Sequence, residues 1–170
     1  IEAIRGEEGA ALILRGLDLR VRGDALSVSG LPSVTGEGLR LDSSEGAAVV
    51  FNDVAAMDVQ ADGLTSVGSF EHGIYLSNAS GTFQATEVTL NQAFEGGLTV
   101  EGGAPAVTIG ELTTTGGYVG VSFNAPDGVL TLGEPGDAAA MSVTLPFESA
   151  LLAVAGDITV HGLRASQVPL

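Results

Sequence analysis

Cysteine, tryptophan and lysine are absent from this sequence of 170 residues, and aromatic residues make up only 5% of it. Without cysteine, the chain forms no disulfide bond and offers no thiolate to a metal ion. Its six basic residues are all arginine, against 21 acidic residues, which gives a formal net charge of -15. A field of this sign repels phosphate groups, so we expect no nucleic-acid binding and no attachment to an anionic membrane surface.

Long apolar runs are also missing, and no stretch reaches the roughly 18 apolar residues of a membrane-spanning helix. We therefore expect no direct membrane insertion. The hydrophobic fraction of 45% is nevertheless too high for a disordered acidic chain. Together with 25 glycines, it indicates a packed domain that is rich in turns.

Apolar residues recur in an octet whose first, third, sixth and eighth positions are apolar. Alternation within each half predicts a strand with one buried face, and the two-residue step between the halves predicts a bend. Copies start at Leu12, Val49, Phe83, Val107 and Ile158. A short strand opened by glycine is found at Gly38, Gly73, Gly97 and Gly120. The preserved order predicts stacked turns, with two lengthened early turns and a degenerate turn between residues 128 and 155.

The segment 107–123, which contains an octet and the glycine strand at Gly120, resembles the repeat of right-handed parallel β-helix proteins. That group includes the pectin-lyase-like superfamily, phage tailspikes and bacterial surface passengers. The expected fold is all-β, a right-handed parallel β-helix of about six turns over residues 9–165. Residues 1–8 are assigned to a partial N-terminal cap and 166–170 to a C-terminal tail. An antiparallel β-sandwich is the alternative, because short strands with glycine turns also fit it.

His72 and Glu37 are the candidates for acid–base catalysis. Aligning the tripeptide around Glu37 with the tripeptide around His72 places the two side chains on neighbouring turns. The resemblance implies that hydrolases of this fold use clustered aspartates and a basic substrate clamp. Because neither an Asp-Asp pair nor any lysine or arginine lies between Arg40 and Arg164, the sequence favours ordinary corner residues over a catalytic pair.

Asp53, Glu87 and Glu111 occupy the same octet position and are the candidates for a metal site. Carboxylates stacked on successive turns repel one another, and a calcium ion would relieve that repulsion. The alternative is an acidic edge that solvent and salt screen.

Tyr75 is the candidate for ligand binding, because exposed aromatic rings in shallow β-helix grooves hold sugars. Tyr118 follows Gly117 and fits either such a groove or a plug at a corner. The six phenylalanines, particularly Phe51, Phe83 and Phe123, are expected in the core.

The sequence favours a non-enzymatic, secreted or cell-surface module of a bacterial protein, which acts as a rigid spacer or adhesin segment. The alternative is a carbohydrate-active β-helix enzyme or a polysaccharide-binding module. Expected partners are carbohydrate or another cell-surface protein. Because an open solenoid leaves unpaired strands at its ends, end-to-end self-association is also expected.

Overall fold

Parallel strands form the regular structure in the computed structural model, which describes residues 4–6, 11–136, 141–145 and 148–167. They belong to one 15-stranded sheet that coils into a β-solenoid of about six turns. Every pairing between the described strands is parallel, which excludes the antiparallel β-sandwich. In the same ranges, no helix is long and apolar enough to cross a membrane.

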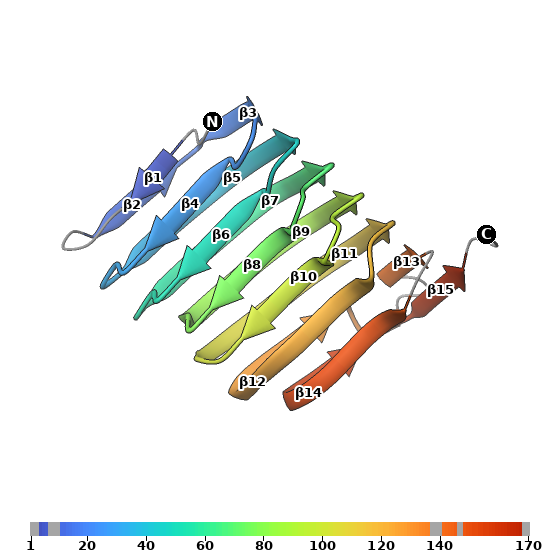
Figure 1. The fold of residues 1–170 in the computed structure, drawn as a ribbon. Helices are drawn as coiled ribbons and strands as arrows, with labels where there is room; N and C mark the ends of the chain where they lie inside the picture. Colours follow the sequence, from blue (N-terminus) through green and yellow to red (C-terminus); the bar gives the residue numbers. More distant parts are fainter. Residues whose placement is uncertain (1–3, 7–10, 137–140, 146–147, 168–170) are drawn as a thin grey trace.

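Each turn has three faces, which we name A, B and C in chain order. The strands of face A lie side by side along the solenoid (Figure 1). They are β1 (Ile4–Gly6), β4 (Leu26–Ser29), β6 (Val49–Asn52), β8 (His72–Ser77), β10 (Gly96–Glu101) and the first halves of β12 (Val119–Leu132) and β14 (Ser149–Val160).

Faces B and C share long bent strands, whose first halves lie on face B and second halves on face C. These are β5 (Val34–Ser44), β7 (Met57–Val67), β9 (Ser80–Asn91) and β11 (Ala104–Thr115). Face B also contains β2 (Leu12–Arg15) and the second halves of β12 and β14. Face C also contains β3 (Asp18–Arg22), β13 (Met141–Leu145) and β15 (Leu163–Gln167).

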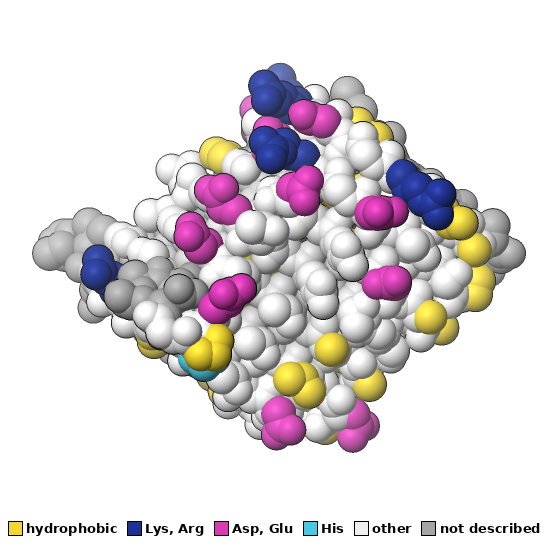
Figure 2. Space-filling view, turned by 180° about the vertical axis from the view of Figure 1, so that it is seen from behind, with side chains coloured by type: hydrophobic (Ala, Val, Ile, Leu, Met, Phe, Trp, Pro, Cys, Tyr) yellow, Lys and Arg dark blue, Asp and Glu magenta, His cyan; other side chains and the backbone are white. Residues whose placement is uncertain are grey.

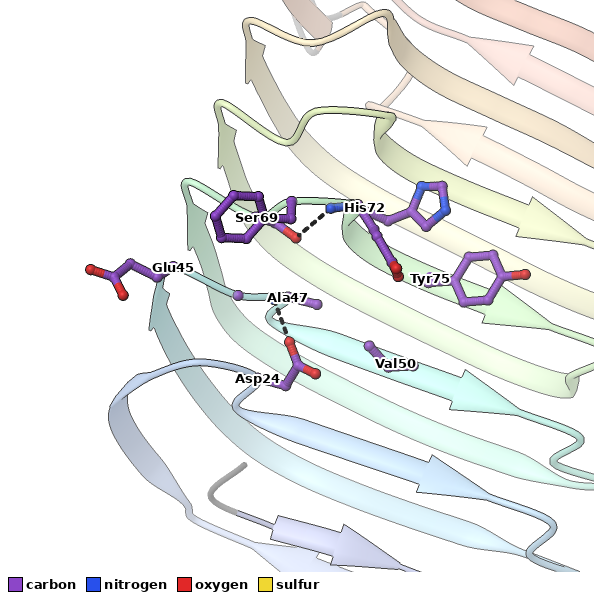
Figure 3. A pocket seen from close by; sticks show the side chains of 10 residues that line it. Asp24, Glu45, Ala47, Val50, Ser69, His72 and Tyr75 are labelled. Atoms are coloured by element: carbon purple, nitrogen blue, oxygen red, sulfur yellow. Dashed lines mark hydrogen bonds between the residues drawn. The ribbon is translucent and has the colours of Figure 1, made fainter. Parts of the chain in front are cut away.

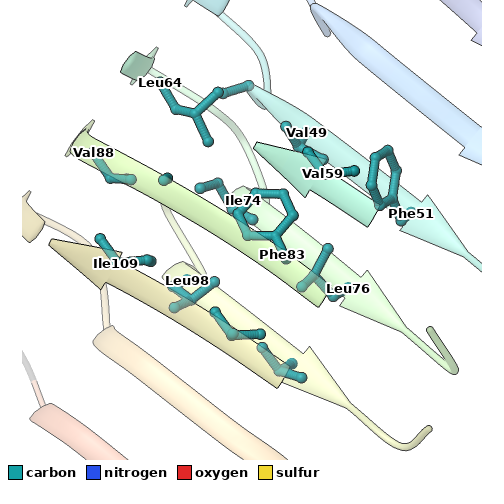
Figure 4. Packing of buried hydrophobic residues seen from close by; sticks show 14 of the residues in the cluster. Val49, Phe51, Val59, Leu64, Ile74, Leu76, Phe83, Val88, Leu98 and Ile109 are labelled. Atoms are coloured by element: carbon teal, nitrogen blue, oxygen red, sulfur yellow. The ribbon is translucent and has the colours of Figure 1, made fainter. Parts of the chain in front are cut away.

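The inward side chains of the three faces meet in one continuous core (Figure 4). Phe51, Phe83 and Phe123 are all 0% exposed, as the sequence predicted for these three. Phe51 from face A meets Phe83 from face B edge to face, with ring centroids 6.4 Å apart. Buried aromatic rings in this arrangement contribute beyond their area alone. The core therefore joins the faces as well as the turns.

Residues with positive φ mark the corner between faces A and B on successive turns. They are Gly30, Asp53, Asn78 and Gly102. The N–H of each donates to a carbonyl of the next turn, as from Asp53 to Ser77 at 2.9 Å and from Asn78 to Glu101 at 2.8 Å. Asp and Asn tolerate this left-handed conformation better than most other residues with a side chain. A second such column marks the corner between faces C and A: Gly23, Glu45, Gly68, Gln92 and Gly116.

Three of the five predicted octets, those that start at Phe83, Val107 and Ile158, stack in register. Val107 pairs with Phe83. Leu130 pairs with both Val107 and Ile158, so it supplies the missing strand between these two octets. The predicted degenerate turn in 128–155 is thereby confirmed.

The octet at Val49 is wrong, because Val49 and Phe51 lie on face A and pair with Ile74 and Leu76. Val59 is the residue that pairs with Phe83. The glycine strand at Gly38 is also wrong, since Gly38 lies at the bend within β5, with a φ of +61°.

The early turns are consequently not lengthened. Partners on face A from Leu26 to Val121 recur every 23 to 25 residues. The octet at Leu12 does lie on faces B and C, but it is shifted by two residues. Leu14, and not Leu12, aligns with Val59, because both residues pair with Gly36.

Strand pairing extends beyond residues 9–165 at both ends. β1 pairs with β4, and β15 pairs with β13 as far as Gln167. The rest of the predicted cap and tail, residues 1–3, 7–8 and 168–170, lies outside the described residues.

Ion pairs connect the first turn to the second. They are Arg15–Glu37 at 3.8 Å, Arg20–Asp42 at 3.4 Å and Arg22–Glu45 at 2.5 Å. All six side chains are substantially exposed, so each pair contributes little to stability. Seen from behind, arginine side chains lie toward the margins, while acidic side chains are spread more widely among uncharged ones (Figure 2).

Candidate functional site

His72 and Glu37 do not form the predicted acid–base pair. Glu37 lies on β5 beside Arg15, with which it pairs in register. His72 begins β8 and pairs in register with Gly96 on β10. The alignment is wrong because the glycine after Glu37 belongs to a bend, whereas the glycine after His72 belongs to a strand of face A.

The predicted carboxylate ladder is only partly present. Glu87 and Glu111 pair in register on β9 and β11, but the position one turn earlier holds Gly63. Asp53 lies instead at the corner between faces A and B, where its Oδ1 accepts a hydrogen bond from Asn78 Nδ2 at 3.2 Å. In the described part of the chain, no group of three or more His, Asp or Glu side chains is arranged to hold a metal ion. The three predicted carboxylates therefore do not converge on one calcium ion, which takes about six to eight oxygen ligands.

A hollow of about 280 Å³ lies where the corner between faces C and A changes length. Three residues separate the corner residue Glu45 from Val49 on face A, whereas five separate Gly68 from Ile74 one turn later. The longer corner overhangs the shorter one. The lining residues are Asp24, Glu45, Gly46, Ala47, Val50, Ser69, Phe70, Glu71, His72 and Tyr75.

Asp24 and the buried serines fix the shorter corners beneath this overhang. The Oδ1 of Asp24 accepts a hydrogen bond from the backbone N–H of Ala47 at 2.8 Å (Figure 3). Ser43 donates to the carbonyl of Gly23, and Ser66 donates to the carbonyl of Gly46, both at 2.6 Å. These bonds attach each corner to the next turn, so the lower wall of the hollow is held by the fold.

His72 and Tyr75 form the upper wall, with their rings stacked 4.7 Å apart at an interplanar angle of 10°. His72 Nδ1 lies 2.9 Å from Thr99 Oγ1, and His72 Nε2 lies 3.4 Å from Glu95 Oε2. Burial lowers the pKa of His72, against the opposing effects of Glu95, Glu71 and Glu101.

The predicted ligand-binding residue, Tyr75, is thus half-buried on the wall of the hollow. Its hydroxyl donates a hydrogen bond to Glu101 Oε2 at 2.9 Å. Burial raises the pKa of this phenol, so the hydroxyl retains its proton at neutral pH. Tyr75 therefore presents a ring whose orientation is fixed by His72 on one side and Glu101 on the other.

Three aromatic side chains are exposed at the same corner on successive turns, and we name them the aromatic corner ladder. They are Phe70 at 85% exposed, Phe94 at 57% and Tyr118 at 38%. Each follows the corner residue with positive φ by two positions, and backbone bonds run from Phe94 N–H to Ser69 and from Tyr118 N–H to Phe94. Phe94 and Tyr118 meet edge to face at 5.3 Å. Phe70 belongs to both the ladder and the hollow.

All six phenylalanines were expected in the core, which is wrong for Phe70 and Phe94. A signal was available, because the dipeptide Phe-Glu occurs three times, at 70–71, 94–95 and 147–148, a few residues before a strand of face A. Phe147 itself lies outside the described residues. A repeated Phe-Glu outside the octets indicates a corner position that is not part of the core.

The hollow and the ladder combine aromatic faces with carboxylate acceptors, which are the groups that hold a sugar ring by stacking and hydrogen bonding. The described lining contains no arginine, so it provides no counter-charge for an anionic sugar. No family model, curated protein or solved structure matches this chain.

Proposed function

We propose that the chain is a non-enzymatic module of a secreted or cell-surface bacterial protein, in which the solenoid is a rigid spacer and an adhesin segment. The aromatic corner ladder carries the proposal. Large apolar rings exposed at the same corner of three successive turns are costly in water, and such patches mark binding surfaces. Bacterial origin and surface location are supported by the resemblance to surface passengers.

The spacer role is supported by the way in which each turn is attached to the next. Inward side chains form one core along the described turns, and both columns of corner residues donate hydrogen bonds between turns. Neighbouring turns cannot separate without breaking both the core contacts and the corner hydrogen bonds. A solenoid with these contacts therefore resists bending. It would hold the ladder at a fixed position.

The adhesin role is tested by screening the chain against immobilised polysaccharides. We expect at least one to be retained, and retention to fall about tenfold when Phe70, Phe94 and Tyr118 are all changed to Ser. The control is Val154→Ser, which removes a 62% exposed apolar side chain from β14, away from the ladder. Failure of every polysaccharide to bind, or equal retention by the triple variant, would contradict the proposal.

A carbohydrate-active enzyme is the second candidate, and the position of His72 near Glu95 favours it. An imidazole 3.4 Å from a carboxylate is the arrangement of a general acid or base, and it lies on the wall of the hollow. The test is release of reducing ends from any polysaccharide that the chain retains. Cleavage that His72→Ala abolishes without loss of retention would support an enzyme. Retention without cleavage by the intact chain would contradict it.

We also propose end-to-end self-association, with carbohydrate or a further surface protein as the other partners. Leu163 on the last described turn is 47% exposed although its partner Met141 is buried, and the inward Leu12 and Leu14 on the first turn are only partly buried. Association between such turns would bury this surface. Sedimentation analysis should show concentration-dependent oligomers, and a monomer at every concentration would refute the idea.

A further inference from the structure

Carboxylates dominate the electrostatics of the hollow. Asp24, Glu45 and Glu71 line it, and Glu95 lies next to His72 on its wall. The nearest arginine in an ion pair, Arg22, is 2.5 Å from Glu45 and neutralises that carboxylate alone. Because the sequence has no lysine, the remaining carboxylates create a field that attracts a cation and repels an anion.

Aromatic rings adjoin these carboxylates in a repeated manner. Phe70 is followed by Glu71, and Phe94 by Glu95, at equivalent corners of neighbouring turns. Turns stack about 4.8 Å apart, which is close to the length of one β-linked hexose unit. A ligand that runs along the solenoid would therefore meet a ring and a carboxylate at each of these two turns, and a ring at Tyr118 on the next.

The size of the hollow limits how much of such a ligand it can enclose. Small-molecule sites occupy about 300–1,000 Å³, and this hollow, at about 280 Å³, is at the lower end. It accommodates one or two sugar rings, and the rest of a polymer would lie over Phe94 and Tyr118.

We propose that the hollow and the aromatic corner ladder bind a cationic amino-sugar polymer, a chain of β-linked glucosamine units with free amino groups. This rests on the proposed adhesin function and specifies its ligand. Ammonium groups pair with Asp24 and Glu71, and the apolar faces of the sugar rings stack on Phe70 and Phe94. An ammonium group above an aromatic face gains further attraction from the ring. A neutral sugar would leave the carboxylates uncompensated, and a lysine peptide would lack the flat faces that match the repeated rings.

The test is calorimetric titration of the chain, at a pH where glucosamine is protonated, with three probes: a glucosamine hexamer, an N-acetylglucosamine hexamer and hexalysine. We expect the glucosamine hexamer to bind about tenfold more tightly than either other probe. The double variant Asp24→Asn with Glu71→Gln should weaken its binding about tenfold or more. Asn keeps the acceptor for the N–H of Ala47, so the corner stays folded.

A matched control removes two acidic charges elsewhere, through Asp127→Asn and Asp157→Asn. Both residues are exposed and neither lines the hollow. Binding by this control should stay within about twofold of the intact chain, because non-specific attraction is screened by salt. Phe70→Ala should weaken binding about tenfold and leave the circular dichroism spectrum unchanged, since the ring is largely exposed.

Four results would overturn the inference, whereas the adhesin function is tested separately by its own polysaccharide screen. Equal binding of the acetylated hexamer would show that the ammonium groups are not recognised. Equal binding of hexalysine, or equal weakening by the two charge variants, would show attraction to acidic surface in general. Absence of binding by the glucosamine hexamer would overturn the inference directly.

Discussion

Replacing Phe83 with Ala should destabilise the chain strongly, because its ring lies in the middle of the core. The ring is 0% exposed and meets Phe51 edge to face at 6.4 Å. Truncation of a buried Phe costs about 3–5 kcal/mol through lost transfer free energy and the cavity that remains. Loss of the edge-to-face contact adds to this. We expect the free energy of unfolding to fall by about 4 kcal/mol, and the melting temperature by roughly 10 °C.

Phe70→Ala is the matched control, because the same atoms are removed from a ring that is almost wholly exposed. Exposed substitutions away from special backbone conformations change stability by about 0.5 kcal/mol or less. Urea unfolding followed by circular dichroism gives both values, and the slope of each curve shows whether the same surface is exposed on unfolding.

Losses of similar size for Phe83→Ala and Phe70→Ala would refute the reasoning. They would mean that the ring of Phe83 does not point into the core, although Phe83 pairs in register with Val59 and Val107. A loss below about 1 kcal/mol for Phe83→Ala would refute it equally, because no relaxation of a packed core recovers that much.

Three further predictions follow from single residues. Gly81 and Gly136 have φ of +104° and +101°, but a Cβ at Gly81 would lie 2.2 Å from a backbone oxygen of the neighbouring turn, whereas Gly136 has open space. Urea unfolding should therefore show that Gly81→Ala loses about 2 kcal/mol or more beyond Gly136→Ala. The hydroxyl of Thr114 is buried and has no hydrogen-bond partner among the described residues, so Thr114→Val should raise the free energy of unfolding by about 1 kcal/mol. A loss of stability would contradict this. Because burial lowers the pKa of His72, the folded chain binds fewer protons than the unfolded chain, and stability should fall as the pH drops below about 6.5. Relative to His72→Gln, the unfolding free energy of the intact chain should decline through that range, and a constant difference would contradict this.

The class of fold was predictable because core positions are constrained twice, by alternation along each strand and by repetition between turns. Phe83 and Val107 satisfy both constraints, and their octets are in register. The register of the early turns was not predictable from the octet alone. Val49 and Phe51 alternate just as Val59 and Ala61 do, although one pair lies on face A and the other on face B. Apolar pairs on different faces are alike in sequence, so only the turn length separates them.

The candidate site was less predictable, because the residues that form it are outside the repeat. Tyr75 and His72 were identified by residue type and do line the hollow, but their partners Thr99, Glu95 and Glu101 come from the next turn. Those contacts depend on the register between neighbouring turns. The incorrect glycine strand at Gly38 had led to a wrong prediction of that register. Phe70 was missed because all six phenylalanines were assigned to inward positions, although its corner provides none.

Corner length, more than strand sequence, determines where this solenoid has a binding surface. The number of residues between the corner residue and face A is two in the first turn and three in the second, then five in the third and fourth. Residues of the shorter corners are fixed by backbone bonds and buried serines, and they cannot project. The added residues of the longer corners also form backbone bonds between turns, but their side chains are exposed and free of core packing, so they can contact a ligand. The hollow forms at the step from three residues to five, and the exposed rings begin there with Phe70. Shortening the third corner by deleting Phe70 and Glu71 should therefore remove the hollow while the strands on either side keep their register.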